Sequence, residues 1–234
     1  LSTEGQDVLN FVVTGQVRCG ASVIQSSVNS HPAGTCHADL LHRDERLRKL
    51  YHEEYFEKQE TVEIPDWYFP GSISPEQYLT TRVFDNNMLG ERSVGTKLLY
   101  EQLCDHDLWE YFQGWCRAGD FCIIHVTRNP LACYVSLKQA RHSGIWQQDI
   151  NDKTVFPRPA SVSIDVEEFV YFCRWHAAHE AKVRSMCDDR LEITYRELFL
   201  DYRAVMRGVF EFLELEPYPL VSPGFRRLKN RNIK

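Results

Sequence analysis

The sequence predicts an α/β protein with three layers, in which helices cover both faces of a central parallel sheet. Three observations predict this fold. Short runs rich in β-branched residues alternate along the chain with longer segments whose apolar residues recur at helical spacing. The first such run ends in a glycine and leads through a loop into a helix. The run at residues 121–127 is followed by Asn129 and Pro130, which typically begin a helix.

The predicted elements follow in order along the chain. Strands are expected at residues 8–14, 34–38, 93–98, 121–127 and 190–194, and helices at 21–28, 44–58, 107–116, 130–142 and 204–213. Residues 61–87 contain several prolines and aromatic residues, and they are expected to form an irregular excursion with a short helix. Asp165 and Glu168 resemble a capping box at the start of a long helix. That helix is expected to place its apolar residues on one side, namely Val166, Phe169, Val170, Cys173, Ala177 and Val183.

The composition limits the classes of function. With 234 residues, of which 43% are hydrophobic, residues 1–234 are expected to form one domain. The net charge of -6 argues against a broad nucleic-acid surface, which needs clustered Lys and Arg. The 8 Cys form no CxxC pair and no zinc-like group, so a reducing, cytoplasmic location is expected.

Targeting signals are not recognised in the sequence. No stretch approaches the ~20 apolar residues that span a bilayer, and the first residues lack the basic and apolar regions of a signal peptide. The chain is therefore expected to be soluble. Because Leu1 is not an initiator residue, a longer or anchored parent protein stays open.

A phosphate-binding loop is predicted between the first strand and the first helix. Gly15 and Gly20 have the spacing of such a loop, and Ser22 stands where the loop carries Ser or Thr. The glycines allow the backbone to curl, so that the N–H groups of the loop, including those of Cys19 and Ala21, can point at an anion at the helix N-terminus. The lysine of ordinary P-loops is missing, which makes a kinase or an ATPase less expected.

Two arginines offer anion ligands near this loop. Arg18 lies inside it, and its guanidinium can bind a phosphate or a sulfate at two points. Arg128 lies at the end of the strand at 121–127, and Ser136 follows two turns into the next helix, so both can face one anion. Two separate anion sites suit the two phosphates of one nucleotide, whereas a triphosphate needs them in line. The alternative is a plain strand-to-helix turn, with Arg128 in a surface salt bridge.

These motifs resemble those of sulfotransferases that use 3′-phosphoadenylyl sulfate. Residues 18–22 are similar to the family's R-S-G-T-S/T loop for the 5′-phosphosulfate, with Cys19 and Ala21 as departures. Residues 128–136 resemble its 3′-phosphate signature. The resemblance covers about residues 10–215 and is greatest to the bacterial branch that sulfates sugars and glycolipids, including the trehalose-type enzymes. Further segments resemble the family in the same order, namely 94–98, 194–198 and 212–215.

The resemblance implies a P-loop, kinase-like fold and in-line transfer of a sulfuryl group from the nucleotide to an acceptor hydroxyl. The second product would be 3′-phosphoadenosine 5′-phosphate. Lys97 and Arg18 are expected to stabilise charge on the departing bridging oxygen, with no metal. In relatives a late basic stretch closes over the 3′-phosphate, which implies Arg227 or Lys229 here, although a solvated tail is an alternative.

The general base that takes the acceptor's proton has several candidates. Two leucines follow Lys97, so the histidine that follows the lysine in the cytosolic branch is absent. Residues 36–41 resemble the C-H-G-E-L-F run of sugar-modifying relatives, which implies Asp39 as the base. His37 or His42 can take its place, because the ordinary pKa of histidine lies near neutrality.

Two other functions stay open at this point. A P-loop kinase-like enzyme would bind ATP with magnesium through a carboxylate, but His125 to Arg128 stand where a Walker-type aspartate is expected. A non-catalytic member of the fold would bind the nucleotide and transfer nothing. The acceptor is expected to be a small molecule or a glycan, chosen by the excursions at 61–87 and 145–162. The sequence does not indicate an oligomeric state.

Overall fold

The central sheet of the protein is parallel, as the sequence predicts. The computed structural model describes residues 8–38, 40–41, 74–84, 91–119, 121–144, 146 and 161–219. In this part of the chain the strand order is β2-β3-β1-β4-β5. The strands are β1 (Leu9–Gly15), β2 (Gly34–His37), β3 (Ser93–Leu99), β4 (Cys122–Thr127) and β5 (Arg190–Thr194). All five predicted strands are confirmed, and the central strand β1 has β3 and β4 as its neighbours.

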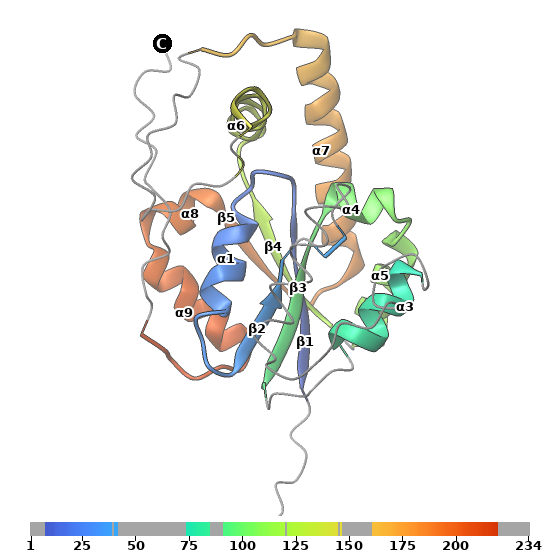
Figure 1. Cartoon of the computed structure of the whole chain (residues 1–234), viewed down its shortest axis with the longest axis vertical. Coiled ribbons are helices and arrows are strands. Elements are labelled where there is room, and N and C mark those ends of the chain that lie inside the picture. Colours follow the sequence, from blue (N-terminus) through green and yellow to red (C-terminus); the bar gives the residue numbers. More distant parts are fainter. Residues whose placement is uncertain are drawn as a thin grey trace, which may run out of the picture.

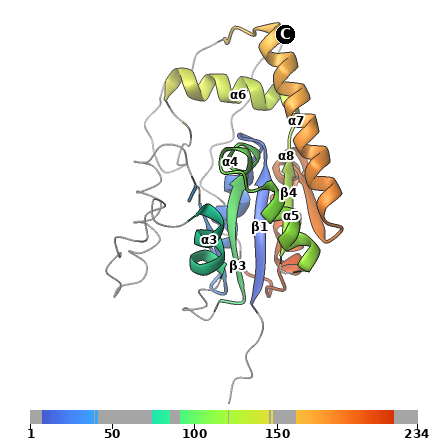
Figure 2. The same cartoon turned by 90° about the vertical axis from the view of Figure 1, so that its right-hand side faces the viewer.

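Helices cover both faces of this sheet, which confirms the three-layer fold. One face carries α1, α8 and α9, and the other carries α3, α4, α5 and α7 (Figure 1). The described helices are α1 (Ala21–Val28), α3 (Pro75–Tyr78), the π-helix η2 (Leu79–Phe84), α4 (Tyr100–Asp105), α5 (Trp109–Ala118), α6 (Pro130–Ser143), α7 (Val166–Met186), α8 (Tyr195–Leu200) and α9 (Tyr202–Phe212). Figure 2 shows that α6 lies across the carboxyl end of the sheet.

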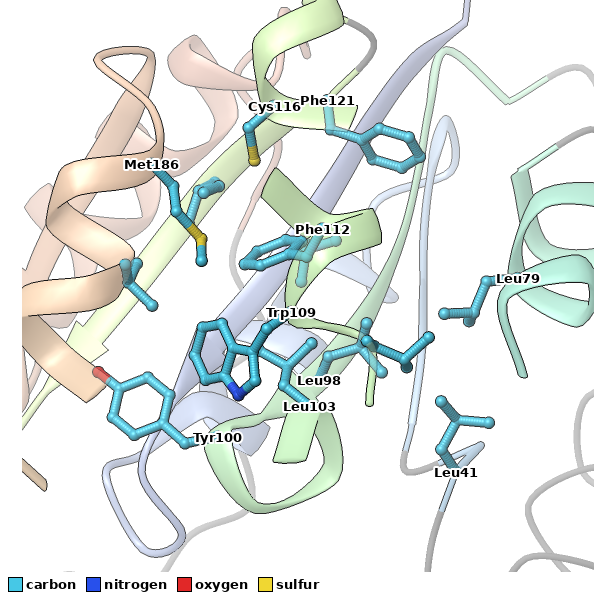
Figure 3. Close-up of a cluster of buried hydrophobic side chains, with 14 of the residues drawn as sticks. Leu41, Leu79, Leu98, Tyr100, Leu103, Trp109, Phe112, Cys116, Phe121 and Met186 are labelled. Carbon is cyan, nitrogen blue, oxygen red and sulfur yellow. The ribbon is translucent and has the colours of Figure 1, made fainter. Parts of the chain in front are cut away.

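The core is divided by the sheet into two apolar clusters. Side chains alternate along β1, so Phe11 and Val13 enter the cluster under α1 and α9, while Val12 enters the cluster on the opposite face. Trp109 and Phe112 of α5 pack into this second cluster, together with residues of α4 and α7 (Figure 3). β1 is therefore buried on both faces, and the loop that follows it starts from a fixed position.

Two helices differ from the sequence prediction. The helix predicted at 107–116 starts two residues later, as α5, and α4 precedes it. Asp107, at the break, has a left-handed φ of 52° that interrupts helical geometry. The short helix α8 was not predicted, although Thr194 and Glu197 form a capping box at its start. The predicted helix at 44–58 lies outside the described residues.

The long helix α7 begins as predicted, but its apolar residues do not share one buried side. Asp165 accepts a hydrogen bond of 2.9 Å from the N–H of Glu168. Val183 is buried, whereas Val166 is 70% exposed and Val170 is 41% exposed. The reason is visible in Figures 1 and 2, where the N-terminal half of α7 extends beyond the end of the sheet. None of the described helices is long and apolar enough to cross a membrane.

Candidate functional site

Two positions of the loop between β1 and α1 require glycine. Gly20 has a φ of 107°, and a Cβ atom added there would lie 2.7 Å from Cδ2 of Tyr195. A Cβ atom on Gly15 would lie 2.3 Å from the carbonyl oxygen of Val126 in the neighbouring strand. No side chain caps the start of α1. The positive end of the α1 dipole therefore lies at this loop, a position suited to an anion.

Arg18 joins this loop to α6. It has a left-handed φ of 71°, which is uncommon for a residue with a side chain. Its Nε donates a hydrogen bond of 3.0 Å to Oγ of Ser136, and its Nη1 donates to the carbonyl oxygen of Trp146. Two predicted anion ligands from separate motifs are thus in direct contact.

Arg128 approaches the same loop from the end of β4. Its Nη1 donates a hydrogen bond of 2.8 Å to the carbonyl oxygen of Arg18. Its guanidinium lies 4.1 Å from the centre of the Tyr195 ring, a distance at which a cation–π interaction stabilises the position of the arginine. The Tyr195 ring also occupies the space into which a side chain at position 20 would extend. The ring therefore supports both the loop and Arg128, a role that the sequence did not indicate.

Lys97 reaches the loop from β3, on the other side of β1. Its side chain is 3% exposed, and its Nζ donates a hydrogen bond of 3.0 Å to Oγ of Ser22. The lysine absent from the loop itself is thus replaced by one from a neighbouring strand. Arg18 lies in the loop, and Arg128 and Lys97 approach it from β4 and β3, so three cationic side chains gather at the loop.

The two departures from the family loop are buried residues that fill space. Cys19 is 1% exposed and Ala21 is 3% exposed. Burial raises the pKa of the Cys19 thiol to about 12, so this side chain stays neutral at physiological pH. The N–H of Cys19 donates a hydrogen bond of 3.0 Å to the carbonyl oxygen of Gln16, so the prediction that it points at an anion is wrong. Cys19 and Ala21 therefore contribute packing to the loop, and no charge.

Gln16 is a member of the loop that the sequence analysis did not select. Its side chain is 1% exposed, and neither atom of its amide has a hydrogen-bond partner among the described residues. Nε of Arg128 is also without a partner in this part of the chain. Buried polar groups without partners are rare and costly, so these atoms are available to contact a bound group. The position of Gln16 in the sequence, between Gly15 and Arg18, could have identified it as a residue of the loop.

Of the three candidates for the general base, only His37 lies among the described residues. His37 is buried at the end of β2, where it pairs in register with Thr96, the residue before Lys97. It therefore lies near the carboxyl edge of the sheet, as a base requires. Asp39, His42, Arg227 and Lys229 lie outside the described residues, and their predicted roles stay predictions.

Within the described ranges, no group of three or more His, Cys, Asp or Glu side chains is arranged to hold a metal ion.

Comparisons with known proteins find one similar curated protein and two similar solved structures. No protein-family model matches the chain. Nodulation protein H of Rhizobium tropici, a sulfotransferase, is 26% identical over 209 residues, which cover 87% of this chain and 74% of that protein. This similarity supports the sulfotransferase resemblance that the motifs indicate.

Two solved structures are also similar to the chain, each at 14% sequence identity. Sulfotransferase STF9 from Mycobacterium avium has a TM-score of 0.43, with 89% of this chain and 64% of that chain covered. A sulfotransferase from Alicyclobacillus acidocaldarius has a TM-score of 0.44, with 92% and 85% covered. The chain thus spans less than two thirds of the Mycobacterium avium protein's length.

Proposed function

We propose that this chain, a relative of the sulfotransferases, transfers the sulfuryl group of 3′-phosphoadenylyl sulfate to a hydroxyl of an acceptor. The observation that carries the proposal is the contact between Arg18 and Ser136, because it unites the loop and the Arg128 motif in one site. A nucleotide with phosphates on both its 3′ and 5′ positions needs two adjacent anion sites of this kind. A nucleoside triphosphate does not.

The described residues divide between the two ends of this nucleotide. Arg128 and Ser136 are assigned to the 3′-phosphate, and the N–H groups at the start of α1 are assigned to the 5′-phosphosulfate, with Arg18 and Ser22. Two parallel hydrogen bonds from a charged guanidinium fix both the position and the orientation of an anion. The donor is a substrate in this scheme, and the protein supplies only binding groups and charge.

The reaction forms one bond and breaks another. The acceptor oxygen forms a bond to sulfur while the bond from sulfur to the 5′-phosphate oxygen breaks, and 3′-phosphoadenosine 5′-phosphate leaves. Negative charge develops on the bridging oxygen, and Lys97 and Arg18 are the cations assigned to stabilise it. The hydroxyl proton passes to a base, for which Asp39 is proposed and His37 is the alternative.

The acceptor class is proposed from the sequence resemblance alone. Residues 36–41 and the segment after Arg128 resemble the branch that sulfates sugars and glycolipids. A carbohydrate or glycolipid hydroxyl is therefore the proposed acceptor. If Asp39 is the base, Asp39→Asn removes turnover and leaves nucleotide affinity nearly unchanged, whereas full turnover in this variant assigns the proton transfer to another group.

Calorimetric titration with two nucleotides tests the proposed donor. The wild type should bind 3′-phosphoadenosine 5′-phosphate and should prefer it to ATP with magnesium, and Arg128→Ala should weaken this binding by about ten-fold or more. Arg207→Ala, on an exposed position of α9, is the matched control and should bind like the wild type. A preference for ATP would favour a kinase-like enzyme. Binding without transfer to any hydroxyl would favour a non-catalytic member of the fold.

A further inference from the structure

The N-terminal half of α7 presents an apolar surface that no part of the core covers. Val170 is 41% exposed and Tyr171 is 70% exposed, and Glu167 and Arg174 flank them on the same side of the helix. These four positions follow the spacing i, i+3, i+4 and i+7 of a single helix face. A depression of about 320 Å³ is lined by them and by Val166. The four residues are called the outer face of α7 below.

The opposite side of the same helix makes the contacts with the rest of the protein. The rings of Phe169 and Phe172 lie 5.2 Å from the ring of Tyr134 in α6, and His176 and Val183 are buried. The packing side of α7 is therefore already occupied. The outer face is a second, smaller apolar surface that stays open to a partner.

The charges on the outer face have a symmetric order. Glu167 and Arg174 lie one on each side of the midpoint between Val170 and Tyr171, and seven residues of helix separate them by about 10 Å. Within the described part of the chain, neither of these charged side chains forms a salt bridge with another residue. A partner should thus carry a positive and a negative charge at the same separation, in reverse order, around an apolar centre.

We propose that the outer face of α7 binds the same face of a second copy of this chain, with the two helices antiparallel. A two-fold axis through the midpoint of the face brings Glu167 of each copy opposite Arg174 of the other, and Val170 opposite Tyr171. Apolar residues meet at the centre of this register, and both charged pairs have opposite signs.

The size of the outer face indicates how stable the dimer is, and its charges indicate which class of partner it binds. Two helix faces of this length bury less than the ~1,200 Å² of a standard stable interface, so the dimer should be in reversible exchange at micromolar protein. A membrane surface is a poorer partner, because helices that bind membranes carry a basic rim, and this face has one acid and one base. The proposal is independent of the chemistry assigned to the loop.

Charge reversal tests both the surface and its register. Sedimentation velocity over a range of concentrations should show a monomer–dimer equilibrium for the wild type. Glu167→Lys and Arg174→Glu should each weaken dimerisation by roughly ten-fold or more, because each places two pairs of like charges opposite one another. The double variant E167K/R174E restores opposite charges and should dimerise like the wild type. Arg207→Glu, on α9, is the control and should have no effect.

Two results would overturn the proposal. A wild type that stays monomeric at all concentrations has no such dimer, and single reversals that leave a dimer unchanged place its interface elsewhere. If the double variant is as weak as the single ones, the antiparallel register is wrong. Thermal unfolding of each variant, followed by circular dichroism, checks that the substituted helix still folds.

Discussion

Arg18 Nε and Ser136 Oγ are joined by a hydrogen bond of 3.0 Å, although 118 positions separate the two residues in the sequence. Arg128 joins these two residues, because its Nη1 donates a hydrogen bond to the carbonyl oxygen of Arg18. The loop after β1 and the helix after β4 are therefore parts of one site at the carboxyl edge of the sheet. That edge is where ligands bind in folds of this kind.

Replacing Arg18 should remove a direct ligand of the nucleotide. Arg18→Ala is expected to weaken binding of 3′-phosphoadenosine 5′-phosphate by about ten-fold or more, since hydrogen bonds from a charged group contribute about 1.5–3 kcal/mol. Arg18→Lys keeps the charge but not the planar fork that contacts Ser136 and Trp146, so it should recover only part of the affinity. Calorimetric titration measures both. Equal affinity in all three proteins would separate Arg18 from the nucleotide site.

The glycine at the start of α1 should be required for the fold of the loop. Gly20→Ala is expected to lower the free energy of unfolding by about 1–3 kcal/mol, because φ is 107° and the new Cβ would lie 2.7 Å from the Tyr195 ring. Urea denaturation measures this change. Gly114→Ala in α5 is the matched control, because no atom lies within 4 Å of its added Cβ. That substitution should stabilise the helix by up to about 1 kcal/mol.

The sequence predicted the elements of the site more completely than their contacts. All five strands were predicted, most clearly those at 8–14 and 121–127, because buried parallel strands have continuous apolar, β-branched segments. The glycines, Arg18, Arg128 and Ser136 were selected from their spacing and from the resemblance of their motifs to the sulfotransferase signatures. The bond between Arg18 and Ser136 and the ring of Tyr195 over Arg128 were not predicted, because they depend on the relative placement of distant elements.

The prediction for α7 shows a different limit. Helical spacing identified its apolar residues, and Val183 is buried as expected. The sequence does not state how far the sheet extends beneath a helix, so Val166 and Val170 were assigned to the same side and are exposed. The break between α4 and α5 at Asp107 was also not predicted. The residues around it have no glycine or proline to mark the left-handed turn.

Replacing Gln16 should raise the stability of the unliganded protein and lower its affinity for the nucleotide. Gln16→Met removes two buried polar atoms without partners among the described residues, so the free energy of unfolding of the unliganded protein should rise by about 1 kcal/mol. The affinity for 3′-phosphoadenosine 5′-phosphate should fall if the amide binds the nucleotide. Gln25→Met is the contrast, because Gln25 Nε2 donates to the carbonyl oxygen of Cys36, and its loss should destabilise the protein. Destabilisation by Gln16→Met would show that the amide is satisfied without ligand.

The buried histidine of β4 should make stability depend on pH. His125 Nδ1 donates a hydrogen bond of 3.0 Å to Glu192, and its Nε2 accepts one from the hydroxyl of Tyr100. Burial lowers the pKa of His125 below its ordinary value of 6.5, against the opposing effect of Glu192. Below pH 6.5 the unfolded chain thus binds a proton that the folded protein does not. The stabilisation is present above this pH and is lost as the pH falls.

Denaturation at two pH values measures this effect. The free energy of unfolding should fall between about pH 6.5 and about pH 5.5, at a rate of up to about 1.4 kcal/mol per pH unit for each such histidine. Burial also lowers the pKa of His176, which adds to the loss with the same sign. His125→Gln should make the dependence on pH less steep. An unchanged dependence in this variant would assign the effect to other groups.

The 3′-phosphate provides the most direct test of a two-phosphate donor site. Calorimetric titration should compare 3′-phosphoadenosine 5′-phosphate with AMP, which lacks that phosphate, in the wild type and in Arg128→Ala. The wild type is expected to bind the doubly phosphorylated nucleotide at least about ten-fold more tightly, and Arg128→Ala should lose most of this preference. Equal affinity for both nucleotides in the wild type, or no binding of either, would contradict the assignment of this site to a sulfuryl donor.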